Sequence, residues 1–147
     1  MLTWFARDDT PVLMGTRVVL RAPQAGDFRA WRDLRLASRA FLKPFEPRWS
    51  EADLGEQVYR ARLKRGRQEA ADGSDFTFFI FVSEGGRQVL VGGITLSNIR
   101  RRAAQFGTLG YWMGQQFAGR GLMTEAVRLL VAHAFDQLLL HRVHAAF

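Results

Sequence analysis

The stretch QFAGRGLMTEA, residues 116–126, follows a strand-like segment at 106–113 and leads into a strongly helical one. A turn of small residues therefore lies at a strand-to-helix junction. Gly119 and Gly121 let the backbone approach a ligand closely and adopt a positive φ. The first N–H groups of the following helix lack partners within the helix and lie at its positive end. This junction is predicted to bind an anion, and a pyrophosphate fits it.

The spacing of the turn separates three kinds of phosphate-binding loop. A nucleoside-triphosphate loop requires Gly-Lys-Ser/Thr, but Leu122 follows Gly121 here. A dinucleotide-binding fold requires G-x-G-x-x-G at its first strand–helix junction, but residue 124 is Thr and this junction comes late in the chain. The remaining pattern is Q-x-x-G-x-G, with Gln116 at its start. A glycine-rich helix start with no ligand is the alternative that the motif alone leaves open.

That pattern resembles the acetyl-coenzyme A loop of the GCN5-related N-acetyltransferase (GNAT) family. The resemblance implies an α/β (α+β) GNAT fold, in which helices flank a central, mostly antiparallel sheet. It also implies acetyl-coenzyme A as cosubstrate. The chain length predicts a single N-acetyltransferase domain over residues 1–147, and the three histidines show no metal-ligand arrangement, so no metal is expected. Backbone N–H groups near Trp112 or Met113 would hold the thioester carbonyl. The cofactor-binding residues that the resemblance implies are Tyr111, Trp112, Met113, Gln116, Ala118, Gly119, Arg120, Gly121 and Thr124.

Hydrophobic periodicity predicts the order β-α-α-β-β-β-α-β, which is similar to this family from its first strand to its fifth. The predicted strands are 16–22, 76–83, 88–98, 106–113 and one that begins at 142, and the predicted helices are 25–37, 50–71 and 122–139. Residues 39–49 contain two prolines and are predicted to form an irregular loop beside the site. In the family the domain continues beyond the fifth strand. The C-terminal part, with the proton donor, is therefore expected to be missing.

Composition limits the classes of function. The chain has 147 residues and a net charge of +7, with arginine-rich clusters at 60–67 and 100–102. These clusters are either solvated surface or a basic patch that would be attracted to the ribosome surface. Aromatic residues do not interleave with them, which argues against sequence-specific nucleic-acid binding. No apolar run approaches the roughly 20 residues of a membrane span, and the chain has no cysteine, so a cytoplasmic protein is expected.

Glu46 and Glu125 are the candidate catalytic bases, directly or through water. Glu125 lies in the first turn of its helix, where a role in complementing the helix dipole explains it equally well. Glu46 lies between two prolines, and we expect it to hold a cationic amine. The absence of cysteine excludes a cysteinyl-acyl intermediate, so direct transfer in a ternary complex is expected. The expected substrate-binding residues are Phe45, Glu46, Trp49 and Asn98.

A closer resemblance rests on three stretches: FLKPFEPRW at 41–49, GGITLSNI at 92–99, and LGYWM at 109–113 leading into GLMTEA at 121–126. They are similar to the bacterial acetyltransferases of ribosomal-protein N-termini, notably of the N-terminal alanine of small-subunit protein S5. The resemblance implies a ribosomal-protein N-terminus as the acceptor. Two other interpretations stay open: an acetyltransferase for a small amine or antibiotic, and a non-catalytic ribosome-associated binding module.

Overall fold

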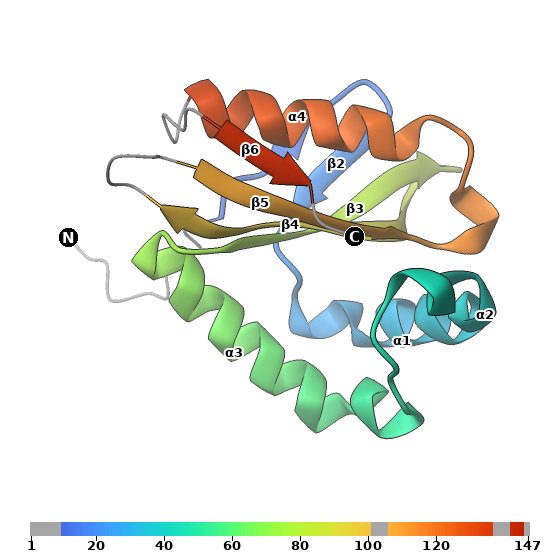
Figure 1. The fold of residues 1–147 in the computed structure, drawn as a ribbon. Coiled ribbons are helices and arrows are strands. Elements are labelled where there is room, and N and C mark those ends of the chain that lie inside the picture. The colour runs from blue at the N-terminus through green and yellow to red at the C-terminus, as the bar shows by residue number, and fades with distance from the viewer. Residues whose placement is uncertain (1–9, 101–105, 137–141, 146–147) are drawn as a thin grey trace.

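A six-stranded sheet forms the centre of the computed structural model, which describes residues 10–100, 106–136 and 142–145 (Figure 1). The strands lie in chain order, and each of the first five is antiparallel to its neighbour, whereas the last is parallel to the fifth. The predicted, mostly antiparallel sheet is confirmed. The strands are β1 Leu13–Met14, β2 Val18–Arg21, β3 Phe76–Glu84, β4 Arg87–Arg100, β5 Phe106–Met113 and β6 Arg142–Ala145.

Helices cover both faces of this sheet, as the family resemblance implies (Figure 1). Helix α4, Leu122–Asp136, lies on one face. Helix α1, Phe28–Ala37, and helix α3, Glu56–Asp72, lie on the other face. The short helix α2 spans Arg39–Leu42. Short 3-10 segments are η1 Ala25–Asp27, η2 Lys43–Phe45, η3 Glu51–Leu54 and η4 Gln115–Phe117.

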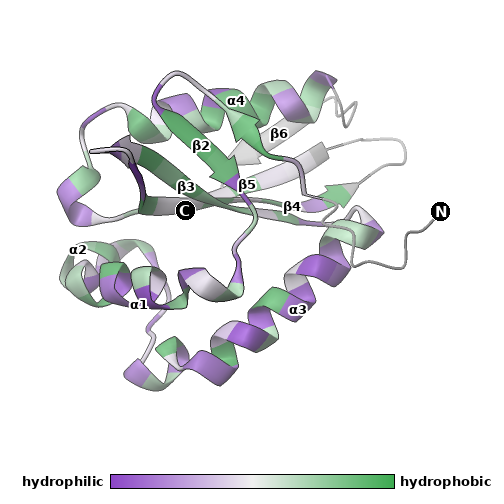
Figure 2. Ribbon diagram, turned by 180° about the vertical axis from the view of Figure 1, so that it is seen from behind, coloured by the Kyte–Doolittle hydropathy of each residue, from purple (hydrophilic) through white to green (hydrophobic). Residues whose placement is uncertain are grey.

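The core lies on both faces of the two central strands. Along β3 the side chains from Phe78 to Val82 are all buried, because helices cover the sheet on both sides. That arrangement explains the continuous apolar run of this strand, where a half-exposed strand would alternate. Figure 2 shows β2 and β3 as hydrophobic and α3 as largely hydrophilic, so α3 presents most of its surface to solvent.

Two predictions for the segment before β3 were wrong in detail. Residues 39–49 were expected to be irregular, but α2 and η2 occupy their first part, and Pro44 lies in the first turn of η2. A proline is accepted there because the first N–H groups of a helix have no internal partner. The helix predicted over 50–71 is divided into η3 and α3 at Gly55. The backbone of Gly55 is extended (φ −71°, ψ 154°), and α3 begins at the next residue.

Helix α4 buries a narrower stripe than its sequence suggests. The buried residues are Leu122, Ala126, Leu130 and Ala134, each one helical turn from the next. Phe135, an apolar residue next to Ala134, is 41% exposed. Small alanines at two of the four positions let the helix approach the sheet closely. Residues 137–139 of the predicted helix lie outside the described residues.

Candidate active site

The junction between β5 and α4 has the backbone geometry that its glycines predict. Gly119 has φ 77° and Gly121 has φ 76°, both in the left-handed region that favours glycine. The side chain of Phe117 is buried and anchors the preceding turn. The loop residues implied as cofactor ligands are exposed together at the start of α4; they are Gln116, Ala118, Gly119, Arg120, Gly121 and Thr124.

Arg17, which the sequence did not single out, binds this loop through the carbonyl oxygens of its peptide groups. Its Nη1 donates to the carbonyl of Arg120 at 2.8 Å, and its Nη2 donates to the carbonyl of Gly121 at 3.1 Å. In a trans peptide the N–H points opposite to the C=O. The N–H groups of Gly121 and Leu122 therefore point away from Arg17. The loop is oriented with these donors available to an anion.

Glu125 fixes Arg17 and the start of β2. Its Oε2 accepts hydrogen bonds from the backbone N–H groups of Arg17 at 2.8 Å and Val18 at 3.0 Å, and its Oε1 accepts from Arg17 Nε at 3.1 Å. Burial alone would raise the pKa of Glu125, but these hydrogen bonds outweigh it and lower the pKa. A carboxylate engaged in this way is a poor proton acceptor. These contacts favour a role for Glu125 in anchoring the loop over the predicted role as a catalytic base.

The end of β5 leads directly into this loop. Among the described residues, β6 pairs with β5 from Phe106 to Leu109, and β5 itself continues to Met113. The N–H of Gly114 donates to the carbonyl of Val91 in β4 at 2.8 Å. Because successive N–H groups of a strand point in opposite directions, those of Tyr111 and Met113 point away from β4. They lie on the side of β5 that faces away from β4.

A second cluster lies on the opposite face of the sheet, where Arg35 and Glu46 form a two-bond ion pair. Arg35 Nη1 and Nη2 donate to the two carboxylate oxygens at 2.9 and 2.7 Å. Trp49 Nε1 donates to the same carboxylate at 3.1 Å. The guanidinium of Arg35 lies between two rings, 5.1 Å from the centroid of Trp49 and 4.9 Å from that of Trp112. Arg35 thus joins the loop 43–49 to β5.

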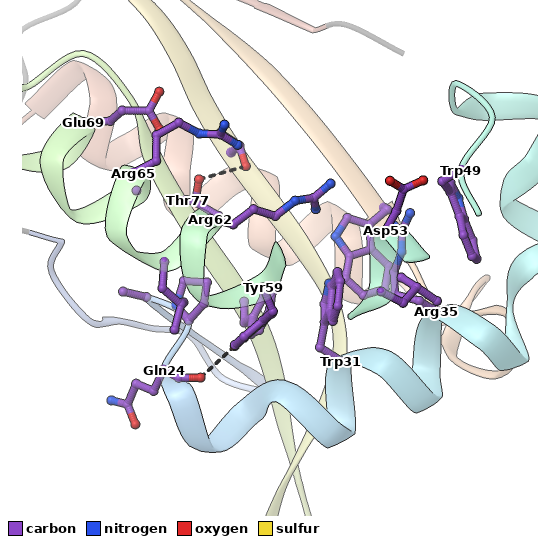
Figure 3. A pocket seen from close by; sticks show the side chains of 18 of the residues that line it. Gln24, Trp31, Arg35, Trp49, Asp53, Tyr59, Arg62, Arg65, Glu69 and Thr77 are labelled. Carbon is purple, nitrogen blue, oxygen red and sulfur yellow. Dashed lines mark hydrogen bonds between the residues drawn. The ribbon is translucent and has the colours of Figure 1, made fainter. Parts of the chain in front are cut away.

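This cluster forms one wall of a cavity of about 910 Å³ between the sheet and helices α1 and α3 (Figure 3). Trp31, Tyr59, Thr77 and Thr95 contribute to its other walls. Trp112 also lines the cavity although it comes from the strand that leads to the glycine loop. The cavity and the glycine loop therefore meet at β5.

Two of the residues expected to bind the substrate do not line this cavity. Phe45 is 62% exposed and does not line the cavity. Its ring packs on that of Phe41, with 6.4 Å between the ring centroids. Asn98 has φ 52° and sits in the irregular part of the β4–β5 pairing between Ser97 and Arg100, also away from the cavity. Asparagine tolerates this left-handed backbone better than most residues, which accounts for its presence. Of the four residues expected there, Glu46 and Trp49 are the ones that line the cavity.

Within the described part of the chain, no three His, Asp or Glu side chains gather as a metal site. Burial lowers the pKa of His133, and the other two histidines lie outside the residues whose side chains are described. No helix in the described ranges is long and apolar enough to cross a membrane.

Residues 17–147 match the acetyltransferase (GNAT) domain family. The chain belongs to the GNAT acetyltransferase family. It is 30% identical over 134 residues to the probable N-acetyltransferase YjcK of Bacillus subtilis, with 91% of this chain and 73% of YjcK covered. It is 32% identical over 133 residues to the [ribosomal protein uS5]-alanine N-acetyltransferase of Escherichia coli, with 89% of this chain and 66% of that enzyme covered.

The fold is also similar to that of a solved member of the family. Mycobacterium smegmatis RimJ in complex with CoA-disulfide superposes with a TM-score of 0.78 at 29% identity, covering 87% of this chain and 61% of RimJ. The chain thus spans between 61% and 73% of the length of these three proteins.

Two arginines of the site, Arg17 and Arg35, were missed from the sequence, whereas Arg62 was noted only as part of the basic cluster 60–67. Arg17 stands 108 residues from the carboxylate that it binds, and Arg35 stands 11 residues from its own. Neither spacing forms a local pattern. One cue was available for Arg35: it follows Trp31 by one helical turn, on the face that this buried tryptophan turns toward the sheet.

Proposed function

We propose that the chain is the catalytic domain of an N-acetyltransferase that uses acetyl-coenzyme A and modifies the N-terminal amine of a ribosomal protein. The N-terminal alanine of uS5 is the favoured acceptor, which would place the reaction in the cytoplasm. One observation carries the proposal: in a member of the GNAT family, an oriented glycine turn follows the end of β5, the strand from which Trp112 lines a cavity.

The cofactor residues divide into two groups in this proposal. The N–H groups of the loop, with those of Gly121 and Leu122 turned outward by Arg17, would bind the pyrophosphate at the positive end of α4. The N–H group of Met113 would bind the pantetheine arm or the thioester carbonyl at the end of β5, on the side that faces away from β4. Coenzyme A bound to RimJ supports this choice of ligand.

The acceptor amine would enter from the cavity on the other face. Attack of its nitrogen on the thioester carbon forms the amide bond and breaks the C–S bond, while the amine loses a proton and the thiolate gains one. In this proposal the transfer is direct, since none of these 147 residues is a cysteine that could carry the acetyl group. Glu46 and Trp49 remain the proposed acceptor-side residues. Arg35 compensates the charge of Glu46. The main proposed role of Glu46 is therefore to hold the cavity wall and to accept a hydrogen bond from the acceptor.

The test is acetylation by the full-length protein of synthetic peptides that carry the first residues of uS5. Mass spectrometry should find one acetyl group on the N-terminal nitrogen, and none on a peptide whose N-terminus is blocked. A protein that binds coenzyme A but acetylates only small amines would exclude the ribosomal acceptor. A protein that binds coenzyme A and acetylates nothing would favour a binding module.

A further inference from the structure

The cavity on the acceptor side carries more positive than negative charge. Five arginines and three carboxylates line it: Arg35, Arg48, Arg62, Arg65 and Arg67 against Glu46, Asp53 and Glu69. Two of the carboxylates are already engaged. Glu46 is bound by Arg35, and Asp53 accepts from the backbone N–H of Ser50 at 2.7 Å. A cationic amine alone does not explain this excess of arginine.

Arg62 is the arginine most directly placed for a ligand. It projects from α3 into the cavity (Figure 3), and its guanidinium lies 5.8 Å from the ring centroid of Trp31. Arg17, Arg21 and Arg35 each donate hydrogen bonds to a carboxylate, whereas Arg62 has no hydrogen-bond or ion-pair partner among the described residues. Its donors therefore face the cavity unused.

The surrounding charges agree with this placement. Burial lowers the pKa of Arg62, and the positive charges of Arg35 and Arg65 lower it further, against the smaller opposing effects of Asp53 and Glu46. The local field is thus positive at the Arg62 guanidinium. Arg65 lies three residues further along α3, so both arginines share one face of the helix. An anion bound there would be held by two adjacent guanidinium groups.

We infer that Arg62, assisted by Arg65, binds an anionic group of the acceptor, a carboxylate or a phosphate, while the reacting amine lies near Trp112. This inference rests on the proposed function and specifies its acceptor class: an amine whose own molecule carries a negative charge. For a peptide, that charge is an acidic side chain within the first few residues. For a small amine, it is a phosphate or carboxylate.

The experiment measures acceptor binding directly on the full-length protein with coenzyme A bound. Of the four tryptophans, Trp31, Trp49 and Trp112 line the cavity, so intrinsic fluorescence reports occupancy. Peptides that begin with alanine carry Glu at the second, third or fourth position, each with a Gln counterpart of the same shape. Phosphoethanolamine, with ethanolamine as the counterpart that lacks the phosphate, is the small-molecule arm. All titrations use one ionic strength, because salt screens such contacts.

The preferred Glu peptide should bind about 10-fold more tightly than its Gln counterpart, as expected for a charge-assisted contact to arginine. Arg62→Gln should abolish this preference, and Arg62→Lys should restore part of it. The matched control is Arg60→Gln, because Arg60 lies on the same helix, outside the cavity, and is 3.8 Å from Glu56. That control should keep the preference. Unfolding temperatures of all variants verify that each is folded.

Equal affinity of the wild-type protein for every Glu and Gln pair, and for phosphoethanolamine and ethanolamine, would overturn the inference. So would a preference that survives Arg62→Gln. A preference confined to phosphoethanolamine would assign the anion to a small acceptor, and one confined to a peptide would assign it to an acidic N-terminal segment. Acetylation of neutral and acidic uS5-like peptides at the same rate would refute this inference alone, whereas failure to acetylate any peptide would refute the proposed function.

Discussion

Glu125→Gln tests whether this carboxylate anchors the cofactor loop or acts as a base. The substitution keeps the size of the side chain but replaces one acceptor oxygen by an amide nitrogen and removes the charge. Oε2 accepts two backbone hydrogen bonds, at 2.8 and 3.0 Å, and Oε1 accepts from Arg17 Nε at 3.1 Å. At least one of these acceptor positions is lost whichever way the amide is oriented.

The size of the effect follows from those contacts. A hydrogen bond to a charged group contributes about 1.5–3 kcal/mol. The ion pair itself adds less than about 1 kcal/mol, since the Arg17 side chain is 53% exposed and solvent screens the pair. We expect a loss of about 2 kcal/mol, which lowers the unfolding temperature by roughly 4–8 °C in a domain of this size. Loosening Arg17 also frees the carbonyls of Arg120 and Gly121, so coenzyme A affinity should fall about 10-fold.

The pH dependence gives an independent check. The pKa of Glu125 is lowered in the folded protein from its ordinary value of 4.5. A lowered pKa means that the ionised group stabilises the fold above the unfolded pKa, and that this contribution is lost as pH falls through the folded pKa. The stability difference between wild type and Glu125→Gln should therefore be full at pH 7 and shrink below about pH 4.5. Thermal unfolding between pH 3 and pH 8 measures it.

The control is Glu56→Gln, which also lies in the first turn of a helix but forms only a 3.8 Å ion pair on the surface. It should change the unfolding temperature little and leave coenzyme A affinity unchanged. A Glu125→Gln protein with wild-type stability and wild-type coenzyme A affinity, but without turnover, would show that Glu125 is a base after all.

Three further predictions concern the loop, the cavity and the chemistry. Gly121→Ala should weaken coenzyme A binding in calorimetry and lower the stability of the fold by about 1 kcal/mol, because φ is 76° and the new Cβ would lie 3.2 Å from Arg17 Nη2. As a control, Gly66→Ala in helix α3, which has open space around it, should stabilise the fold instead. A Gly121→Ala protein with unchanged coenzyme A affinity would show that coenzyme A does not bind at this loop. Glu46→Gln should raise KM for the acceptor or lower kcat while leaving coenzyme A affinity intact, and a loss of coenzyme A affinity alone would show that this loop is misplaced. Incubation with labelled acetyl-coenzyme A and no acceptor should leave no stoichiometric label on the denatured protein, as direct transfer requires.

Most of the fold could be predicted from the sequence because its signals are local. The apolar run of β3, the hairpin at Gly85 and Gly86 and the glycines before α4 each determine nearby backbone geometry. Strand β1 was missed because two residues are too few to form a pattern. The division at Gly55 was missed because a glycine is compatible with a helix interior, and its extended backbone depends on the tertiary path of the chain.

The site could be predicted only where it is made of backbone. The loop 116–121 required little more than spacing, since its N–H groups are presented by the glycine turn and the helix end. The cavity could not be assembled in this way. Its arginines come from α1, α3 and the segment after η2, and the position of each depends on how separate elements pack around Trp31 and Trp112.

The two carboxylates first considered as bases share one structural role, on opposite faces of the sheet. Glu125 holds Arg17, which holds the carbonyls of the glycine loop; Glu46 holds Arg35, which lies between two tryptophans on the cavity wall. In both cases a carboxylate fixes an arginine, and the arginine fixes a segment that would contact a substrate. Sequence alone cannot distinguish such a carboxylate from a base, because the distinction lies in the donors around it. Arg62 differs from Arg17 and Arg35, because it has no carboxylate partner among the described residues and faces the acceptor cavity.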